Sequence, residues 1–472
     1  MSRLKERREA RDGLVMPRVG GGGRPLTAAV DLGASKVACF IMKPDGVNRA
    51  SGTVQVAGAG YVQSKGVRGG AIVNMEEAAQ AIAQAVERAE AMAGVSVSAV
   101  TVSTAGGQLA SRRVEASVQL GARPIAEGDC SRAIQLALAQ ARMPGRRPIH
   151  LLPVSWSVDG ARGVRDPRAM FGRTLALDLL VVSMNESAFH TLSHCLELAH
   201  LSLEGAVASP FAAGLAALEE DEMELGAVCI DLGGGATSVG VFGGGALRHV
   251  DSLPVGGIRV TNDIAVGLST TTAGAERIKT LHGSAIASAK DDRELIEAPH
   301  RGGEQGGGAV FADRSMLTGI IAPRIEETLE MVRDRLKAAR TPIEPGAGVV
   351  LTGGASQLAG VREVAVRVFD RPVRLGRPRR APHLAEAAAG PASEPASRPR
   401  RRGGADDRPP RLAPVAGPGL NSAHARLRPR RRPDRSARLR SGATARRAGL
   451  HPRCGGRPAH ECRAGRGHPQ QL

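Results

Sequence analysis

The sequence predicts an α/β protein of two lobes that share one cleft. An apolar run, an Asp-Leu-Gly turn and a second apolar run occur at 28–42, and the same pattern returns at 226–245. The two aspartates, Asp31 and Asp231, are 200 residues apart, which indicates an internal duplication of one supersecondary unit. Amphipathic helical stretches follow these runs, as is typical of α/β proteins. At 472 residues, with 42% hydrophobic residues, the chain can bury large cores.

The helices are predicted from caps and from apolar spacing. In the clearest one, at 74–93, Asn74 caps the start, acidic residues fill the first turn and Gly94 ends the helix. Strands are expected at 95–103 and 348–354, and 104–182 is expected to mix short strands with one helix. Further helices are predicted at about 128–142, 187–200, 259–267 and 273–282, and along the apolar face of Ile321, Ile325, Leu329, Val332 and Leu336.

The basic charge of the chain is concentrated in its last segment. Residues 377–472 contain 23 Arg, no Lys and six acidic residues, so they carry +17 of the formal +18. The rest of the chain is nearly neutral, which argues against a nucleic-acid function for the whole protein. Aromatic residues make up 2%, too few for a base-stacking platform. We expect 1–25 and the proline-rich tail at 377–472 to be disordered.

Cysteine spacing and hydropathy exclude two further classes. The six cysteines form no Cys-x-x-Cys pair, so disulfide and zinc frameworks are not expected. Cys39, Cys130, Cys195 and Cys229 lie in apolar surroundings and are predicted to be buried free thiols of a reducing compartment. No run of 18 apolar residues occurs, so we expect no membrane span.

Three glycine-rich turns, each directly after an apolar strand, carry the chemistry. They are the first clasp at 31–36 (DLGASK), the second clasp at 231–238 (DLGGGATS) and the third turn at 352–357 (TGGASQ). Glycines let a backbone approach a ligand closely, and successive N–H groups make an anion-binding nest. One such turn alone is typical of a plain hairpin, but two clasps and a later Gly-Gly turn predict a nucleotide site. The chain has no Gly-Lys dipeptide, which excludes a Walker A loop.

Side chains in and near these turns suit a magnesium nucleotide. Asp31 and Asp231, at strand ends in opposite lobes, can hold the water shell of Mg²⁺. The Gly353–Gly354 turn lets an adenine ring lie against backbone. Glu276 and Lys279 share a helix face, as either a ribose-binding pair or a surface salt bridge. Ser35, Thr237 and Lys36 are the expected phosphate donors.

The three turns, in this order, resemble those of the actin/Hsp70/sugar-kinase ATPase superfamily. Within it, LGAVCIDLGGGATSVGVFGGGALRHVDSLPVGGIRVTNDIAVGL at 225–268 and GVVLTGGASQLAGVREVAVRVFDRPVRLGRP at 348–378 are similar to the FtsA family of bacterial cell-division proteins. The resemblance covers about 26–390 and implies an actin-like fold with the 1C insertion of that family. The implied subdomains are 1A at 26–103 and 183–205, 1C at 104–182, 2A at 206–255, 2B at 256–330, and a return to 2A and 1A at 331–376.

The resemblance also implies a function. Family members bind ATP, polymerise into actin-like filaments, and link FtsZ to the cytoplasmic face of the inner membrane at the division site. We therefore expect ATP and Mg²⁺ as ligands, self-association through 1C and 2B, FtsZ and other divisome proteins as partners, and no specific nucleic acid. The FtsZ tail would dock on 2B, with Arg314 and Arg324 as contacts. By resemblance, the phosphates lie at Asp31, Gly33, Ser35, Lys36, Asp231, Gly233, Gly234, Gly235 and Thr237, the adenosine at Gly353, Gly354 and Ser356, and the ribose at Glu276 and Lys279.

Two departures from related chains matter. Related filament ATPases and Hsp70 often carry Glu where Ser209 precedes Pro210, and a hydroxyl cannot orient or deprotonate a water as a carboxylate can. Hydrolysis is therefore expected to be weak. After Pro391, neither the apolar helix nor the amphipathic membrane helix of the family is visible. Arg, Pro, Ala and Gly dominate there without Lys, which is typical of an out-of-frame translation of a GC-rich gene.

Two other functional classes remain open from the residues. A small-molecule kinase of the sugar-kinase branch would need a catalytic carboxylate that faces an acceptor pocket. A binder of nucleic acid or anionic membrane would act through the polybasic tail.

Overall fold

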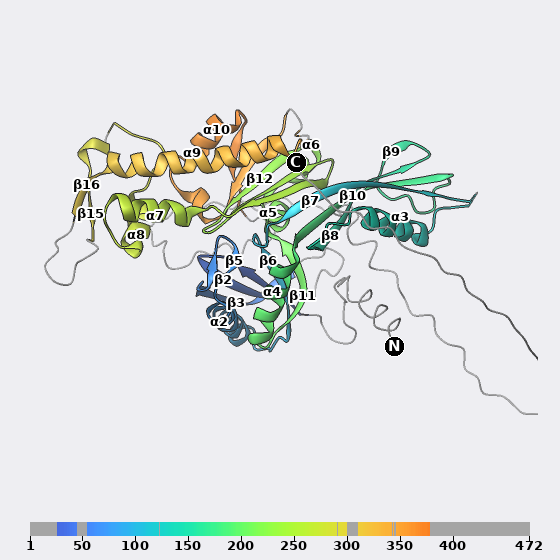
Figure 1. Cartoon of the computed structure of the whole chain (residues 1–472), viewed down its shortest axis with the longest axis horizontal. Coiled ribbons are helices and arrows are strands. Elements are labelled where there is room, and N and C mark those ends of the chain that lie inside the picture. The colour runs from blue at the N-terminus through green and yellow to red at the C-terminus, as the bar shows by residue number, and fades with distance from the viewer. Residues whose placement is uncertain are drawn as a thin grey trace, which may run out of the picture. The chain divides into compact units, whose positions relative to one another are not determined.

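A computed structural model describes residues 26–44, 54–121, 123–289, 291–299, 310–341, 343 and 346–377. The predicted disordered segments, 1–25 and all but the first residue of 377–472, lie outside these residues. The described part is an α/β fold with two principal sheets, as predicted (Figure 1). No helix in the described ranges is both long and apolar enough to cross a membrane.

The internal duplication is confirmed by the strand order. The first sheet has the order β11-β6-β1-β2-β3, and the second begins with β18-β17-β12-β13-β14, so each strand of one has a counterpart in the other. The first sheet contains β1 (Thr27–Leu32), β2 (Lys36–Pro44), β3 (Val54–Gln63), β6 (Ala99–Thr104) and β11 (Ser202–Ala208). The second contains β12 (Ala227–Leu232), β13 (Thr237–Gly243), β14 (Ala246–Leu253), β17 (Gly348–Thr352) and β18 (Val373–Leu375).

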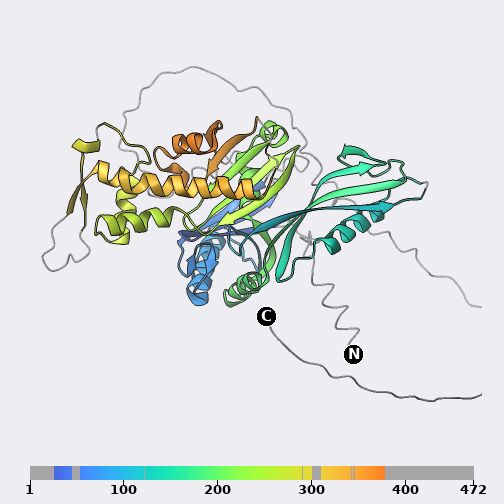
Figure 2. The same cartoon turned by 45° about the horizontal axis from the view of Figure 1, so that its top comes forward.

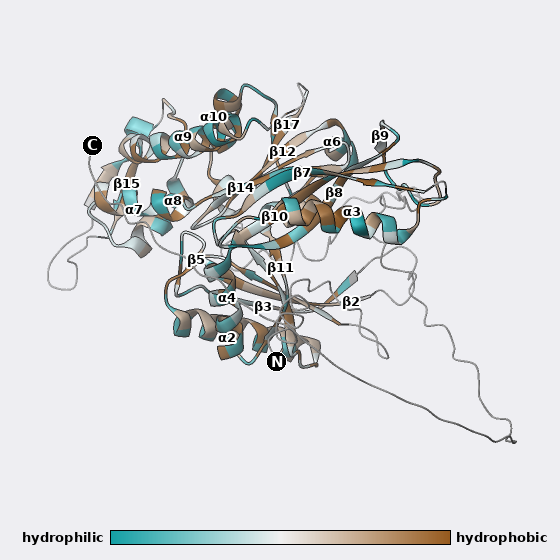
Figure 3. Cartoon of the chain, turned by 45° about the vertical axis from the view of Figure 1, so that its right-hand side comes forward, coloured by the Kyte–Doolittle hydropathy of each residue, from teal (hydrophilic) through white to brown (hydrophobic). Residues whose placement is uncertain are grey.

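Helices α2 (Met75–Ala93) and α4 (Glu186–Leu198) cover one face of the first sheet. The Asn74 side chain accepts a hydrogen bond from the Glu77 N–H at 3.2 Å, and Gly94 ends α2 in a left-handed conformation, so both predicted ends are confirmed. A methyl group added at Gly60 would lie 1.9 Å from the Ala85 carbonyl oxygen. Helix α2 can therefore pack this closely on β3 only because residue 60 has no side chain. Figure 3 shows hydrophobic and hydrophilic residues side by side on α2, as expected for an amphipathic helix.

The second sheet is covered on both faces. Successive side chains of β12 point to opposite faces of this sheet. Val228 and Ile230 pack in the core that contains the long helix, and Cys229 packs in the core on the other face. The predicted helices on one side of this sheet are confirmed, with shifted ends: α7 (Gly257–Gly267), α8 (Thr272–His282) and α9 (Arg314–Ala338). Helix α10 (Val361–Phe369) on the same side, and α5 (Ser209–Ala217) and α6 (Glu220–Leu225) on the other, were not predicted. The four predicted buried thiols are free and buried.

The insertion between β6 and α4 differs from the expected short strands. Its strands β7 (Ala110–Gln119), β8 (Arg146–Val158) and β10 (Thr174–Asn185) have 10, 13 and 12 residues, so that expectation was wrong. Pro148 and Pro153 do not break β8 because each lies at a register shift against β10, where no ladder N–H is required. Helix α3 (Glu127–Gln140) packs against β7 and β10 (Figure 2). The insertion joins the second sheet through one pair, Asp251 with Ala110.

Short elements complete the described chain. Strands β4 and β5 form a hairpin between β3 and α2, and strands β15 and β16 form another between α8 and α9. Strand β9 extends the insertion beside β8. Their bounds are β4 (Val67–Arg68), β5 (Ala71–Ile72), β9 (Ala161–Val164), β15 (Leu295–Ala298), β16 (Val310–Asp313), η1 (Asp291–Arg293) and η2 (Gly354–Gln357).

Candidate nucleotide site

The two clasps have the same backbone geometry. The Gly33 N–H donates to the Lys36 carbonyl at 3.1 Å, and the Gly233 N–H donates to the Ala236 carbonyl at 3.0 Å. A Cβ added at Gly33 would lie 2.9 Å from the Lys36 oxygen, and one at Gly233 would lie 2.7 Å from the Ala236 oxygen. Both turns therefore require glycine at the position two residues after the aspartate.

The clasps also contact each other, although they are far apart in the sequence. A Cβ at Gly234 would lie only 2.1 Å from the Ser35 hydroxyl oxygen. One at Gly235 would lie 2.4 Å from the Ala34 Cβ. The structure thus brings together the predicted residues of both clasps and leaves no room for side chains on the second one.

The two aspartates are electrostatically coupled. Burial raises the pKa of Asp31, against a hydrogen bond from Ser103 and the charge of Lys36, which lower it. Burial and the negative charge of Asp31 raise the pKa of Asp231 to about 6. Asp31 is in contact with solvent and Asp231 is half-buried. Both carboxylates nevertheless lie among many protein atoms, which displace much of the bulk water around them. Two desolvated carboxylates that repel each other fit a divalent cation bound through retained waters.

The third turn lies against the second clasp. Gly353 has φ +86°, and a Cβ there would lie 2.4 Å from Asp231 Oδ1. The Ser356 hydroxyl donates to the Gly353 carbonyl at 2.7 Å and is buried. A Cβ at Gly257 would lie 3.1 Å from the Ala355 Cβ, so the start of α7 also packs on this turn. The backbone predicted to line the adenosine therefore adjoins one of the aspartates.

Glu276 and Lys279 form an ion pair of 2.7 Å on α8, with Lys279 the more buried partner. Lys279 Nζ also donates to the Thr261 hydroxyl at 2.9 Å and to the Gly257 carbonyl at 3.2 Å. Gly257 N–H in turn donates to the Gly233 carbonyl at 3.0 Å. The pair is thus connected to the second clasp, while its contact with a ribose stays a prediction. Thr261 was missed, because nothing in the sequence links it to residues 15 and 18 positions later.

Two predicted phosphate donors have other contacts in this structure. The Thr237 hydroxyl donates to the Val255 carbonyl at 2.7 Å, and the residue is 1% exposed. Lys36 Nζ lies 5.8 Å from the centre of the Tyr61 ring. Thr237 therefore fixes the loop between β14 and α7, and Lys36 acts on Asp31 through charge.

A fourth glycine turn, at Gly69–Gly70, was not predicted. It joins β4 to β5, and a Cβ at Gly235 would lie 3.2 Å from the Gly69 nitrogen. A Cβ at Gly106 would lie 1.7 Å from the Gly70 carbonyl oxygen. The Gly-Gly pair was visible in the sequence, but without a preceding long strand it did not resemble the other turns.

Ser209 lies next to the first aspartate. Its hydroxyl oxygen is 3.1 Å from that of Ser103, which hydrogen-bonds Asp31. Ser209 is 8% exposed, at the start of α5. Ser209 is thus linked through Ser103, by two successive hydrogen bonds, to the Asp31 carboxylate, which is expected to face magnesium.

The two arginines proposed for a partner are paired within the chain. Arg314 Nη1 donates to Glu294 at 2.7 Å, and its Nε donates to the His282 carbonyl at 3.2 Å. Arg324 Nε donates to Asp263 at 2.5 Å. An acidic partner at either position would have to compete with these carboxylates.

Comparison with known proteins agrees with this geometry. The family model described as cell division protein FtsA matches residues 228–396, and that of the SHS2 domain inserted in FtsA matches 106–183. The chain is 41% identical over 374 residues to cell division protein FtsA of Agrobacterium fabrum, covering 78% of this chain and 84% of that one. It is 33% identical over 353 residues to FtsA of Pseudomonas aeruginosa, with 75% and 83% covered.

A solved structure titled PilM-PilN type IV pilus biogenesis complex has a similar fold. The TM-score is 0.52 at 16% identity, over 75% of this chain and 88% of that one. This likeness shows the fold alone, which agrees with the actin-like ATPase architecture predicted from the three turns. Together with the sequence matches over most of its length, it shows that the chain belongs to the FtsA family of cell division proteins.

Proposed function

We propose that the chain binds Mg·ATP between the two clasps. The observation that carries this proposal is the close approach of Gly234 to Ser35 beside two desolvated carboxylates, where the charge of Asp31 raises the pKa of Asp231. Backbone N–H groups of the clasps would bind the phosphates, and Asp31 and Asp231 would orient the waters of Mg²⁺. Glu276 and Lys279 would bind the ribose, and the third turn would line the adenine. Magnesium would supply charge neutralisation between the carboxylates and the phosphates.

We further propose that this protein assembles at the division septum and links FtsZ to the cytoplasmic face of the inner membrane. Membership of the FtsA family supports this role, and filament contacts would involve the 1C insertion and subdomain 2B. The FtsZ tail would dock on 2B near Arg314 and Arg324, where an acidic peptide would replace the internal partners of these arginines.

Fluorescence anisotropy of a labelled FtsZ C-terminal peptide tests the partner assignment. We expect saturable binding that is weakened at least about ten-fold in the double variant Arg314→Glu/Arg324→Glu, because two attractive charges become repulsive. The control is Arg162→Glu on β9 of the insertion, which should bind as the wild type does. Equal affinity in all three proteins would contradict docking at these arginines.

Slow ATP hydrolysis is expected even when ATP binds tightly. Ser209 offers a hydroxyl that already contacts Ser103, and it cannot deprotonate a water. The Ser209→Glu variant introduces a carboxylate and should increase phosphate release, while Ser209→Ala should leave it low. Fast steady turnover by the purified wild-type chain, absent from a Gly234→Asp preparation made in parallel, would disprove this prediction.

Membrane binding by this chain is expected to be electrostatic. Residues 377–472 contain seven Leu and one Val among 23 Arg and 14 Pro, so they offer no continuous apolar face for insertion. Co-sedimentation with anionic liposomes should therefore fall steeply as salt rises to about 1 M, where screening acts within ~3 Å. A truncation before residue 377 should remove the binding. Sedimentation that persists at the highest salt would show an inserted apolar segment instead.

A further inference from the structure

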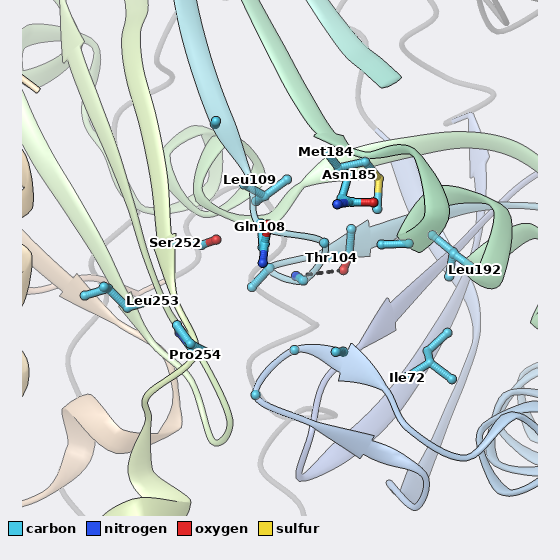
Figure 4. Close-up of a pocket in the computed structure, with 18 of the residues that line it drawn as sticks. Ile72, Thr104, Gln108, Leu109, Met184, Asn185, Leu192, Ser252, Leu253 and Pro254 are labelled. Atoms are coloured by element: carbon cyan, nitrogen blue, oxygen red, sulfur yellow. Dashed lines mark hydrogen bonds between the residues drawn. The ribbon is translucent and has the colours of Figure 1, made fainter. Parts of the chain in front are cut away.

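A cavity of about 760 Å³ lies where the first sheet, the start of the insertion and β14 meet (Figure 4). The Gly69–Gly70 turn and Leu32 of the first clasp line it, so it adjoins the candidate nucleotide site, but none of the residues assigned to the nucleotide lines it. Its volume is within the range of sites that bind small molecules.

Arg146 presents a fixed guanidinium group to this cavity. Its Nε donates to the Ser183 hydroxyl at 2.9 Å and its Nη2 donates to the Ser183 carbonyl at 3.0 Å and to the Gln108 carbonyl. Within the described ranges, Nη1 makes no hydrogen bond. One edge of the charged group is thus held rigidly, while the other remains available to an acceptor.

Ser252 supplies a second unused donor. It is 9% exposed and lines the cavity, and its hydroxyl points toward Gln108 (Figure 4). Among the residues that the structure describes, this hydroxyl has no hydrogen-bond partner. Arg146 and Ser252 lie close to the same stretch of backbone, because Arg146 binds the Gln108 carbonyl and Ala110 is paired with Asp251. Because Ser252 lines the cavity, its hydroxyl can donate its proton to a ligand there.

The charge of the lining favours an anion. Asp251 is its only acidic member, and that carboxylate already accepts from the Ser252 N–H at 2.7 Å and lies 3.7 Å from Arg335 Nε. With Arg146 and Arg335 as its cations, the lining carries a net charge of +1. Asn185 uses its side-chain oxygen to cap α4, so its amide nitrogen is a further donor.

The remaining wall is mixed, with Thr104, Gln108, Ser187 and Thr191 beside apolar residues. Ile72, Leu109, Met184, Leu192 and Leu253 line the cavity around these donors (Figure 4). We propose that the cavity binds a small organic carboxylate, with its anionic group on Arg146 and Ser252 and its apolar part against Met184 and Leu192. This inference does not depend on the proposed nucleotide function.

Ligand-observed NMR on the full chain, in excess Mg·ATP, tests the proposal with 1-naphthoate and its neutral isostere 1-naphthamide. We expect naphthoate to bind with a Kd of about 1 mM or tighter, as is usual for a ligand of this size. The amide should bind at least about ten-fold more weakly, because it lacks the charge that pairs with Arg146. Equal affinity of the two probes, or no binding of either, would overturn the proposal.

Variants locate the site. Arg146→Gln and Ser252→Leu should each weaken naphthoate at least about ten-fold, through a lost charged hydrogen bond and a filled cavity. The matched control Arg162→Gln should not change it. Arg146→Lys keeps the charge and should retain most of the affinity for naphthoate. If Arg146→Gln has a lower Tm than the wild type, Arg146→Lys therefore distinguishes a loss of binding from a loss of folded protein. Naphthoate binding that is unchanged in Ser252→Leu and Arg146→Gln would place the ligand elsewhere and refute the assignment.

Discussion

Replacing Gly234 by Asp should abolish Mg·ATP binding. Even a Cβ at this position would lie 2.1 Å from the Ser35 hydroxyl oxygen and 3.2 Å from the Ser35 Cβ, so the variant must displace the Ser35 side chain from the space between the clasps. The added carboxylate would also lie beside Asp31 and Asp231 and would repel the phosphates. We expect a loss of at least about 100-fold in ATP affinity by calorimetry, equal to ~2.7 kcal/mol.

Gly128→Asp is the matched control for this variant. Gly128 lies in the first turn of α3, where nothing lies within 4 Å of an added Cβ and where a negative charge is favourable. It should bind ATP as the wild type does. If Gly234→Asp keeps its far-UV circular dichroism and also its ATP affinity, the clasps do not form the phosphate site.

Asp231→Asn should stabilise the nucleotide-free protein and weaken Mg·ATP binding. The folded-state pKa of Asp231 is raised from 3.8 to about 6, so between about pH 4 and 6 the folded state holds more protons than the unfolded state. The free energy of unfolding therefore falls as the pH rises through that window. Asparagine does not ionise, so the variant avoids this fall in the free energy of unfolding, which is at most about 3 kcal/mol above pH 6. Loss of a carboxylate that orients the metal shell should cost about 10–100-fold in Mg·ATP affinity.

Thermal melts at pH 4 and pH 7.5 measure the stability effect. The Tm of Asp231→Asn should exceed that of the wild type at pH 7.5 and approach it at pH 4. Asp129→Asn provides a control of opposite sign, because hydrogen bonds from Arg123 and the Ala126 N–H hold the pKa of Asp129 well below its usual range. That variant should melt earlier at pH 7.5. A lower Tm for Asp231→Asn at pH 7.5 would contradict the coupling of the two aspartates.

Local patterns in the sequence predicted much of the fold. The cap at Asn74 and the stop at Gly94 depend on neighbouring residues, and both ends of α2 are as predicted. The repeated Asp-Leu-Gly pattern predicted a duplicated supersecondary unit in two lobes, and the strand orders confirm it and extend the correspondence to five strands of each sheet. The long strands of the insertion were missed, because Pro148 and Pro153 indicate breaks unless their register against β10 is known.

The site was only partly predictable for a similar reason. Strand ends and glycines identified both clasps, yet the contact between Gly234 and Ser35 depends on how the lobes meet. Thr261 joins the Glu276 and Lys279 pair only after α7 and α8 pack together. The sequence also could not predict that the Thr237 hydroxyl donates its hydrogen bond to a backbone carbonyl, because the acceptor lies 18 residues away on the chain.

Calorimetric titration of the full chain with ATP at pH 7.5, with Mg²⁺ and with EDTA, tests the central claim most directly. The clasp geometry predicts one saturable site per chain that is at least about ten-fold tighter with Mg²⁺, because the cation neutralises Asp31 and Asp231. Titration of the Asp31→Asn/Asp231→Asn double variant should show little gain from Mg²⁺. The absence of a binding isotherm, or equal affinity with Mg²⁺ and with EDTA, would contradict a magnesium nucleotide site between the clasps.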